Sequence, residues 1–193
     1  MGKARFSIIA CTSVFLVLFS VFSSLMYLLD YEKETNTVVI GYNEVEIEEE
    51  FEPPSELKQG DNIYKKVVRA KNTGNTDAFV RVFVAFSSKE IDDISLVSTD
   101  NGITYSKFDA FTPLAGWVRN TNDNYFYYTQ PLAPGESTLP LFTNVKTTFE
   151  NAENVQQYEI LVYAESVQTR DINGETSDSF NYFSAWNEFL QRR

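Results

Sequence analysis

Carboxylates and aromatic rings are the side chains that could support chemistry in this chain, because its 193 residues include one cysteine and no histidine. The missing histidine excludes His-based triads, Cys–His dyads and HExxH zinc sites. The densest acidic group alternates along a short stretch, which predicts one solvent-facing strand face and not a catalytic pair. Its members are Glu46, Glu48, Glu49, Glu50 and Glu52. We therefore expect no catalytic residue, no metal site and no cofactor.

Oxygen-rich loops and one aromatic run are the remaining candidates for ligand binding. Asp92-Asp93, Asp100-Asn101-Gly102 and the stretch 120–124 offer oxygen ligands suited to calcium, but none has EF-hand spacing. Turn chemistry explains these residues about as well. The run Tyr125-Phe126-Tyr127-Tyr128 could stack on sugars, although the sequence favours packing in a core.

The charge and the cysteine count limit the partners and the compartment. The net charge of −11 argues against nucleic acid and against docking on anionic lipid, both of which need a basic surface. No cysteine follows Cys11, so no disulfide can cross-link the remainder of the chain. A disulfide-free exported domain of this size suggests a bacterial surface.

An apolar run from Phe6 to Leu29 predicts export. Lys3 and Arg5 precede it and Asp30 follows it, which places the N-terminus in the cytoplasm and the rest outside. The run is long enough to span a bilayer, so it is either a cleaved signal or a retained anchor. We expect 1–30 to be this segment and 31–193 to be one domain. The candidate cleavage region comprises Val21, Ser23, Ser24, Met26 and Tyr27.

The pattern after residue 30 predicts β-strands, because apolar residues alternate between turn signals. Val45, Ile47 and Phe51 should face inward, and Ala78–Phe86 should be central because both its faces are apolar. Residues 87–113 should form a loop, and Gly74 or its neighbouring asparagines should have positive φ. The expected strands are 43–51, 63–70, 78–86, 117–119, 125–129, 139–145 and 156–168, followed by a short C-terminal helix over 179–190. The prediction is an all-β antiparallel sandwich.

Four blocks in this order resemble the camelysin/TasA family of exported proteins of Gram-positive bacteria. They are LLD (28–30) with ETNTVVIG (34–41), LKQGD (57–61) with KVVRAKNTGNTDAFVRV (66–82), LAPGESTLPLF (132–142), and YAESVQ (163–168) with Ala185-Trp186. The resemblance implies a jelly-roll sandwich, cleavage by a signal peptidase of the SipW type, and a role in surface or biofilm-matrix fibres. Leu25 and Met26 stand where the family has small residues before the cut, and 87–128 matches no part of the pattern.

Three functional hypotheses follow. The first is a secreted structural protein of the cell surface or matrix that self-associates, or joins other matrix proteins, by strand addition. Its candidate donor strand is Thr35, Asn36, Thr37, Val38, Val39 and Ile40, which could equally be the first strand of its own sandwich. The second is a membrane-anchored module, touching the membrane only through 6–29, that binds a protein, a glycan or calcium. The third is the metallopeptidase activity attached to camelysin-type proteins, which the missing histidine does not support.

Overall fold

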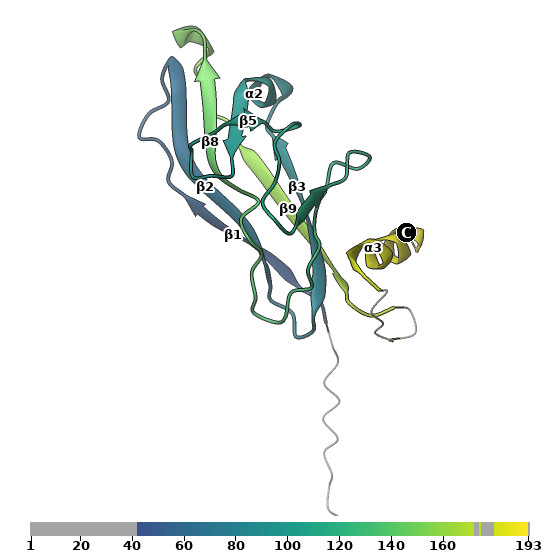
Figure 1. Ribbon diagram of the computed structural model, residues 1–193. Coiled ribbons are helices and arrows are strands. Elements are labelled where there is room, and N and C mark those ends of the chain that lie inside the picture. The colour runs from purple at the N-terminus through teal and green to yellow at the C-terminus, as the bar shows by residue number, and fades with distance from the viewer. Residues whose placement is uncertain (1–41, 172–173, 175–179, 193) are drawn as a thin grey trace, which may run out of the picture. The chain divides into compact units, whose positions relative to one another are not determined.

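Two antiparallel sheets make up most of the structure, a computed structural model that describes residues 42–171, 174 and 180–192. The first sheet has the strand order β1-β2-β8-β4-β5 and the second β6-β7-β3-β9 (Figure 1). The strands are β1 (Val45–Phe51), β2 (Gly60–Asn72), β3 (Ala78–Phe86), β4 (Ser95–Ser98), β5 (Ser106–Lys107), β6 (Trp117–Arg119), β7 (Phe126–Tyr128), β8 (Phe142–Phe149) and β9 (Ile160–Gln168). The predicted export segment, its cleavage region and the donor segment lie outside the described residues.

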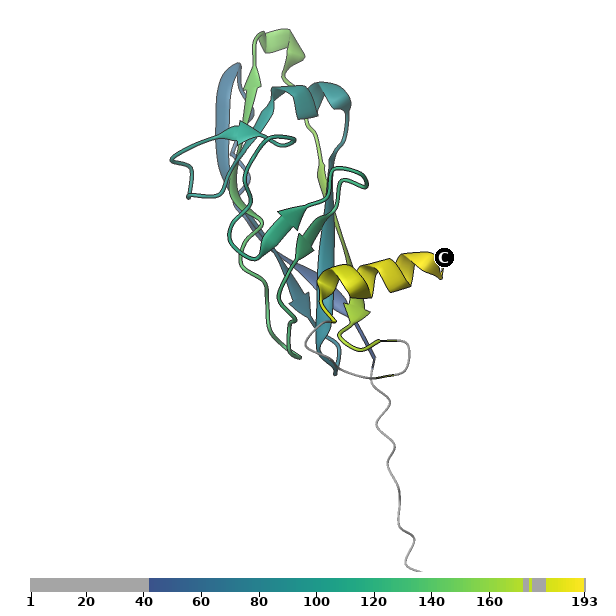
Figure 2. The same ribbon diagram turned by 45° about the vertical axis from the view of Figure 1, so that its right-hand side comes forward.

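The two sheets enclose one apolar core, and Figure 2 shows their strands from a second direction. Val68 on β2 and Val145 on β8 meet Val80 and Val82 on β3, and all four are fully buried. Phe126 on β7 closes the same cluster, with an edge-to-face contact to Phe108 at 5.5 Å. Alternation along each strand sends every second side chain into this layer, so the predicted all-β sandwich class agrees with the structure.

The strand predictions differ in how well they hold. β3 has the predicted bounds and lies between β7 and β9, so its predicted central position is confirmed. The hairpin of β6 and β7 is also confirmed. The prediction for β8 was wrong at both ends, since the strand starts at Phe142 and continues to Phe149. The C-terminal end was placed too early because buried Thr147 replaces an apolar residue in the alternation.

The stretch 87–113 is not the plain loop that was predicted. It contains the helix α2 (Lys89–Ile94) and the strands β4 and β5. Ser88 caps α2, because its hydroxyl accepts a hydrogen bond from the Ile91 amide, and Ile91 is the buried residue of this helix. A six-residue polar helix with one apolar anchor carries too little periodicity to be recognised.

Two kinds of glycine shape the turns. Gly60 and Gly135 have φ of 88° and 83°, which confirms that they supply conformations other residues avoid. Gly74 or one of its neighbouring asparagines was expected to do the same, and that was wrong, because Asn72, Gly74 and Asn75 all lack positive φ. A Cβ at Gly74 would lie 2.6 Å from the Tyr42 carbonyl oxygen and 2.8 Å from the Glu44 nitrogen, so this position requires glycine because two backbones approach closely.

The predicted C-terminal helix is present as α3 (Tyr182–Gln191), capped by Asn181. It packs on the second sheet through Ala185 and Trp186, which contact Phe79 and Val167 in a second small core. A short 3-10 helix, η1 (Ala152–Asn154), joins β8 to the segment before β9.

Candidate interaction groove

Two long strands leave one side of the sandwich open. Within the described residues, β1 pairs with β2 alone and β9 pairs with β3 alone. The edges on the opposite side are β5 and β6, of two and three residues, whereas β1 has seven and β9 has nine. β1 and β9 contact each other across the two sheets. An unpaired edge of this length can pair with a strand of another chain unless charged side chains, proline or a covering element prevent it.

A groove of about 1040 Å³ lies between these edges where β1 ends and β9 begins. Its walls combine apolar rings with a few polar groups, the composition typical of a binding groove. Its residues are Glu49, Phe51, 53–57, Tyr64, Lys66, Ser87 and 155–161. The groove therefore joins the end of the first strand to the segment that leads into the last.

Phe51 marks the place where the core is incomplete. It was expected to face inward with Val45 and Ile47, which do pack against the core. Phe51 is instead 49% exposed, with its ring 5.7 Å from Tyr64 in an edge-to-face contact. The alternation was correct, but the second sheet does not cover this end of β1. An inward-directed aromatic side chain is thus left on the groove wall.

A buried amine lies beside that ring. The Lys66 ammonium donates to a Glu49 carboxylate oxygen at 2.6 Å and lies 4.9 Å from the centre of the Phe51 ring. The Lys66 side chain is 6% exposed and that of Glu49 is 32% exposed. Glu49 has the inward parity of β1, so it is not part of the solvated acidic face that the alternation predicted. It neutralises a lysine that would otherwise be buried unpaired.

Four hydroxyls form a chain at the inner end of the groove. Ser95 Oγ is 3.1 Å from Thr147 Oγ1, which is 2.7 Å from the Tyr158 hydroxyl, and that hydroxyl contacts the Tyr64 hydroxyl. Burial, followed by the hydrogen bond with Tyr158, raises the pKa of Tyr64 far above its ordinary value, and burial also raises the pKa of Tyr158. Both phenols stay neutral, and they tie the start of β9 to the first sheet.

The backbone of β9 presents hydrogen-bonding groups to the open side. The Ser87 amide donates to the Glu159 carbonyl oxygen, and the β3–β9 register continues from Phe86 opposite Ile160 without a bulge. In an antiparallel ladder the bonded residues alternate. The amide and carbonyl groups of Ile160, Val162 and the following even positions therefore point away from β3.

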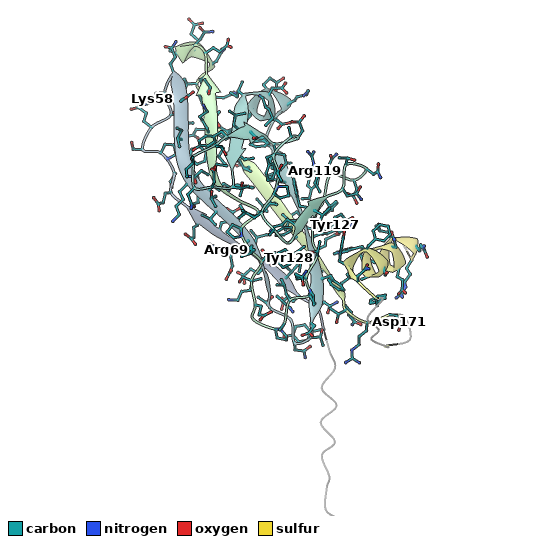
Figure 3. All side chains as sticks on the ribbon, viewed as in Figure 1. Lys58, Arg69, Arg119, Tyr127, Tyr128 and Asp171 are labelled. Carbon is teal, nitrogen blue, oxygen red and sulfur yellow. The ribbon has the colours of Figure 1, made fainter. Side chains whose placement is uncertain are left out.

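The outer face of β1 carries Glu48 and Glu50 of the acidic cluster, each paired with a cation on β2. The Glu48 carboxylate accepts from Ser137 Oγ at 2.6 Å and from Lys71, and the Ser137 bond is the main cause of its lowered pKa. Hydrogen bonds from Arg69 and then Lys65 lower the pKa of Glu50 from 4.5 to about 2. Figure 3 labels Arg69 on this face. These pairs fit the expected solvated face.

In two of the loops with predicted calcium ligands, the aspartate carboxylates accept hydrogen bonds from residues close by in the sequence. The Asp100 carboxylate accepts from Ser98 Oγ at 2.6 Å and from the Thr104 hydroxyl and amide, which lowers its pKa. Asp123 accepts from the Tyr125 amide and the Tyr127 hydroxyl. Asp92 and Asp93 lie in α2. Across the described part of the chain no group of three or more acidic, Cys or His residues could hold a metal ion.

The side chains of the aromatic run 125–128 pack inside the protein, as was predicted from the sequence. Phe126, Tyr127 and Tyr128 are buried, and Tyr125 is half-buried. The ring centre of Tyr127 lies 5.8 Å from that of Trp186 in α3, whereas that of Tyr128 lies 5.1 Å from that of Trp117 in the core. Figure 3 labels both tyrosines. The groove was not predicted from the sequence, although two of its residues, Glu49 and Phe51, were assigned to one strand. The available signal was Glu49, an acidic residue on the inward parity of an otherwise apolar face.

No family model matches the chain, and no curated protein matches it significantly. Among the described residues, no helix is both long and apolar enough to cross a bilayer.

Proposed function

We propose that this chain is an exported structural protein of the bacterial surface or biofilm matrix, whose domains join by strand addition at the groove between β1 and β9. The half-exposed ring of Phe51, inward-directed beside two unpaired strand edges, carries the proposal. A β-strand laid in the groove would cover this ring and satisfy edge backbone groups at once. The resemblance to the camelysin/TasA family supports the same role, including the jelly-roll topology.

The charge pattern favours β9 over β1 as the accepting edge. β1 carries four glutamates in seven residues, and charged side chains are a common guard against edge pairing. β9 has one acidic residue, Glu165, which is paired with Arg81. Its side chains Leu161 and Tyr163 are 57% and 54% exposed. A strand of another acidic subunit meets less repulsion along β9.

The donor we propose is the segment Thr35–Ile40 of a neighbouring subunit, freed when the export segment is cut near Val21–Tyr27. Its run of threonine, valine and isoleucine is suited to an extended strand. Such a contact joins unlike surfaces on the two subunits. It is therefore head-to-tail and can propagate into a filament.

The test compares two recombinant chains, one beginning at Tyr31 and one at Gly41, by electron microscopy and sedimentation. Filaments from the Tyr31 chain alone are expected. Equal assembly of the two chains would show that Thr35–Ile40 is not the donor.

The acceptor is tested in the Tyr31 chain with Ile160→Pro, which removes an amide on the open edge of β9 at the first strand position, where proline is tolerated. Ile160→Val is the matched control because it keeps that amide. Phe51→Lys should also block assembly, whereas Ile63→Lys, on a side chain that is already 55% exposed, should not. Normal filaments from Ile160→Pro and Phe51→Lys would remove the groove from the proposal.

A further inference from the structure

A strip of aromatic rings crosses the outer face of the second sheet beyond the part that α3 covers. Tyr163 on β9 lies directly opposite Phe83 on β3, and the Phe83 ring lies 5.4 Å from that of Tyr125. Beside them, Leu161 lies opposite Ala85. Tyr163 and Leu161 are each more than half exposed. Two such side chains on one strand face form an apolar surface that packing within the described residues does not explain.

The position of each ring is set by the fold below it. The Arg81 guanidinium carbon lies 4.0 Å from the centre of the Tyr125 ring, and the Arg81 side chain is 3% exposed because α3 covers it. Cross-strand pairing holds Tyr163 and Phe83 side by side. The strip is therefore held by the sheet and needs little ordering on contact with a ligand, which lowers the cost of binding.

A polar pocket of about 310 Å³ continues the strip at Phe83. It lies between α2 and the β6–β7 hairpin, next to the end of β3 that β7 does not reach. Asp92, Asp109, Arg119 and Asn124 line it. The Arg119 guanidinium donates to the Asp109 carbonyl and to Asn124 Oδ1. Carboxylate, amide and guanidinium groups are planar and can bind two neighbouring hydroxyls at once.

We infer that this face binds a neutral polysaccharide, with hexose rings stacked on Tyr163 and Phe83 and one sugar unit in the pocket beside Arg119. Sugar rings present C–H faces that pack on aromatic rings, and their hydroxyls suit the planar polar groups of the pocket. The charges decide against an anionic polymer. Lys89 and Arg119, which line the pocket, are matched in charge by Asp92 and Asp109, and the net charge of −11 repels polyanions. The inference rests on the outer face of the second sheet and not on the groove between the sheets, although Leu161 borders both.

The test is native affinity electrophoresis of the full-length chain in gels containing dextran, galactomannan or mixed-linkage β-glucan, with polygalacturonate as the anionic probe. Retardation by a neutral polymer is expected, with about tenfold weaker binding for Tyr163→Ala, equivalent to about 1.4 kcal/mol. Tyr163→Trp should keep binding because it keeps a ring. Ile103→Ala is the matched control, since Ile103 is 81% exposed but lies outside the strip.

Three results would overturn the inference. One is a lack of retardation in every neutral gel, and another is unchanged binding in Tyr163→Ala. The third is self-association that Tyr163→Ala abolishes without any polysaccharide binding, because the face would then be a contact between copies of this chain. A loss of sugar binding in Tyr163→Ala with filaments intact would also distinguish this inference from the proposed assembly, because Tyr163 lies on the outer face of β9, whereas assembly uses the edge backbone of β9 and the ring of Phe51.

Discussion

The Arg81 guanidinium lies over the indole ring of Trp186, with the guanidinium carbon 4.2 Å from the ring centre. The same guanidinium donates to the Glu165 carboxylate and the Tyr127 hydroxyl and lies 4.0 Å from the centre of the Tyr125 ring. One buried arginine on β3 therefore connects β9, the β6–β7 hairpin and the C-terminal helix. Removing Trp186 should release that helix without disturbing the main core, because the two apolar clusters are separate.

Trp186→Ala is predicted to detach α3 from the sheet. Loss of a large buried ring costs about 3–5 kcal/mol, more than a ten-residue helix with few other anchors can offset. Hydrogen exchange of the amides of 182–191 should become about 100-fold faster or more, while β3 amides keep their protection. Phe183→Ala is the control, because Phe183 is 64% exposed. Simultaneous loss of β3 protection would contradict this independence of the helix.

Tyr158→Phe is predicted to destabilise the domain by about 1–3 kcal/mol, because Thr147 and Tyr64 lose a buried hydrogen-bond partner. Urea unfolding measures the effect. Tyr163→Phe should change stability by less than about 0.5 kcal/mol, since that hydroxyl is exposed. Equal effects of the two substitutions would show that the buried chain of hydroxyls contributes nothing.

Alkaline pH should unfold the protein through the same tyrosines. The pKa values of Tyr64 and Tyr158 are raised in the folded state above the ordinary value of 10.0. Their contribution to stability is complete below pH 10 and falls as the pH rises toward their folded values. Ultraviolet titration should show both phenols ionising together with loss of structure. If they titrate near pH 10 in the folded protein, the burial argument is wrong.

Low pH should break the ion pairs between Glu50 on β1 and the cations Arg69 and Lys65 on β2. The pKa of Glu50 is lowered to about 2 by Arg69 and Lys65, so its contribution is present above pH 4.5 and is lost as the pH falls toward 2. NMR titration of the Glu50 carboxyl should give a midpoint near 2. With Arg69 and Lys65 both changed to methionine, the midpoint should return toward 4.5. The effect on stability should be small, because exposed pairs contribute little.

Gly74→Ala should cost more than Gly135→Ala, although only Gly135 has positive φ. A Cβ at Gly74 meets backbone atoms of Tyr42 and Glu44 closer than 3.0 Å, whereas one at Gly135 meets nothing within 4 Å. The left-handed conformation alone costs about 1–2 kcal/mol. Thermal unfolding compares the two variants. If the order is reversed, the approach of the chain at Tyr42 is not a constraint on stability.

Local pattern was enough to predict the strands whose faces are uniformly apolar or regularly alternating. β3 was predicted with its bounds because valine and phenylalanine fill both faces. β8 was misplaced because Thr147 is buried and its hydroxyl is satisfied by partners on other elements. β5 has two residues, too short for any periodicity. Elements that depend on distant partners leave little trace in their own residues.

The groove could not be predicted, because it depends on where one sheet stops covering another. Phe51 and Ile47 have the same parity on β1, yet Ile47 packs against the core and Phe51 does not. No local feature separates the two. Glu49 between them gave a hint, since an acidic residue on an inward face needs a partner, and Lys66 supplies it. That ion pair depends on β1 lying beside β2 in the sheet, which the residues of β1 alone do not specify.

The short lengths of β5 and β6, two and three residues, limit where another chain can pair with this domain. These strands have too few backbone groups for another chain to pair with at that side of the sandwich. On the opposite side, β1 has seven residues and β9 has nine. A polymer of this domain linked through its long edges would therefore remain one subunit wide. It would thicken only through contacts between side chains, so its width should respond to surface substitutions and its length to substitutions in the groove.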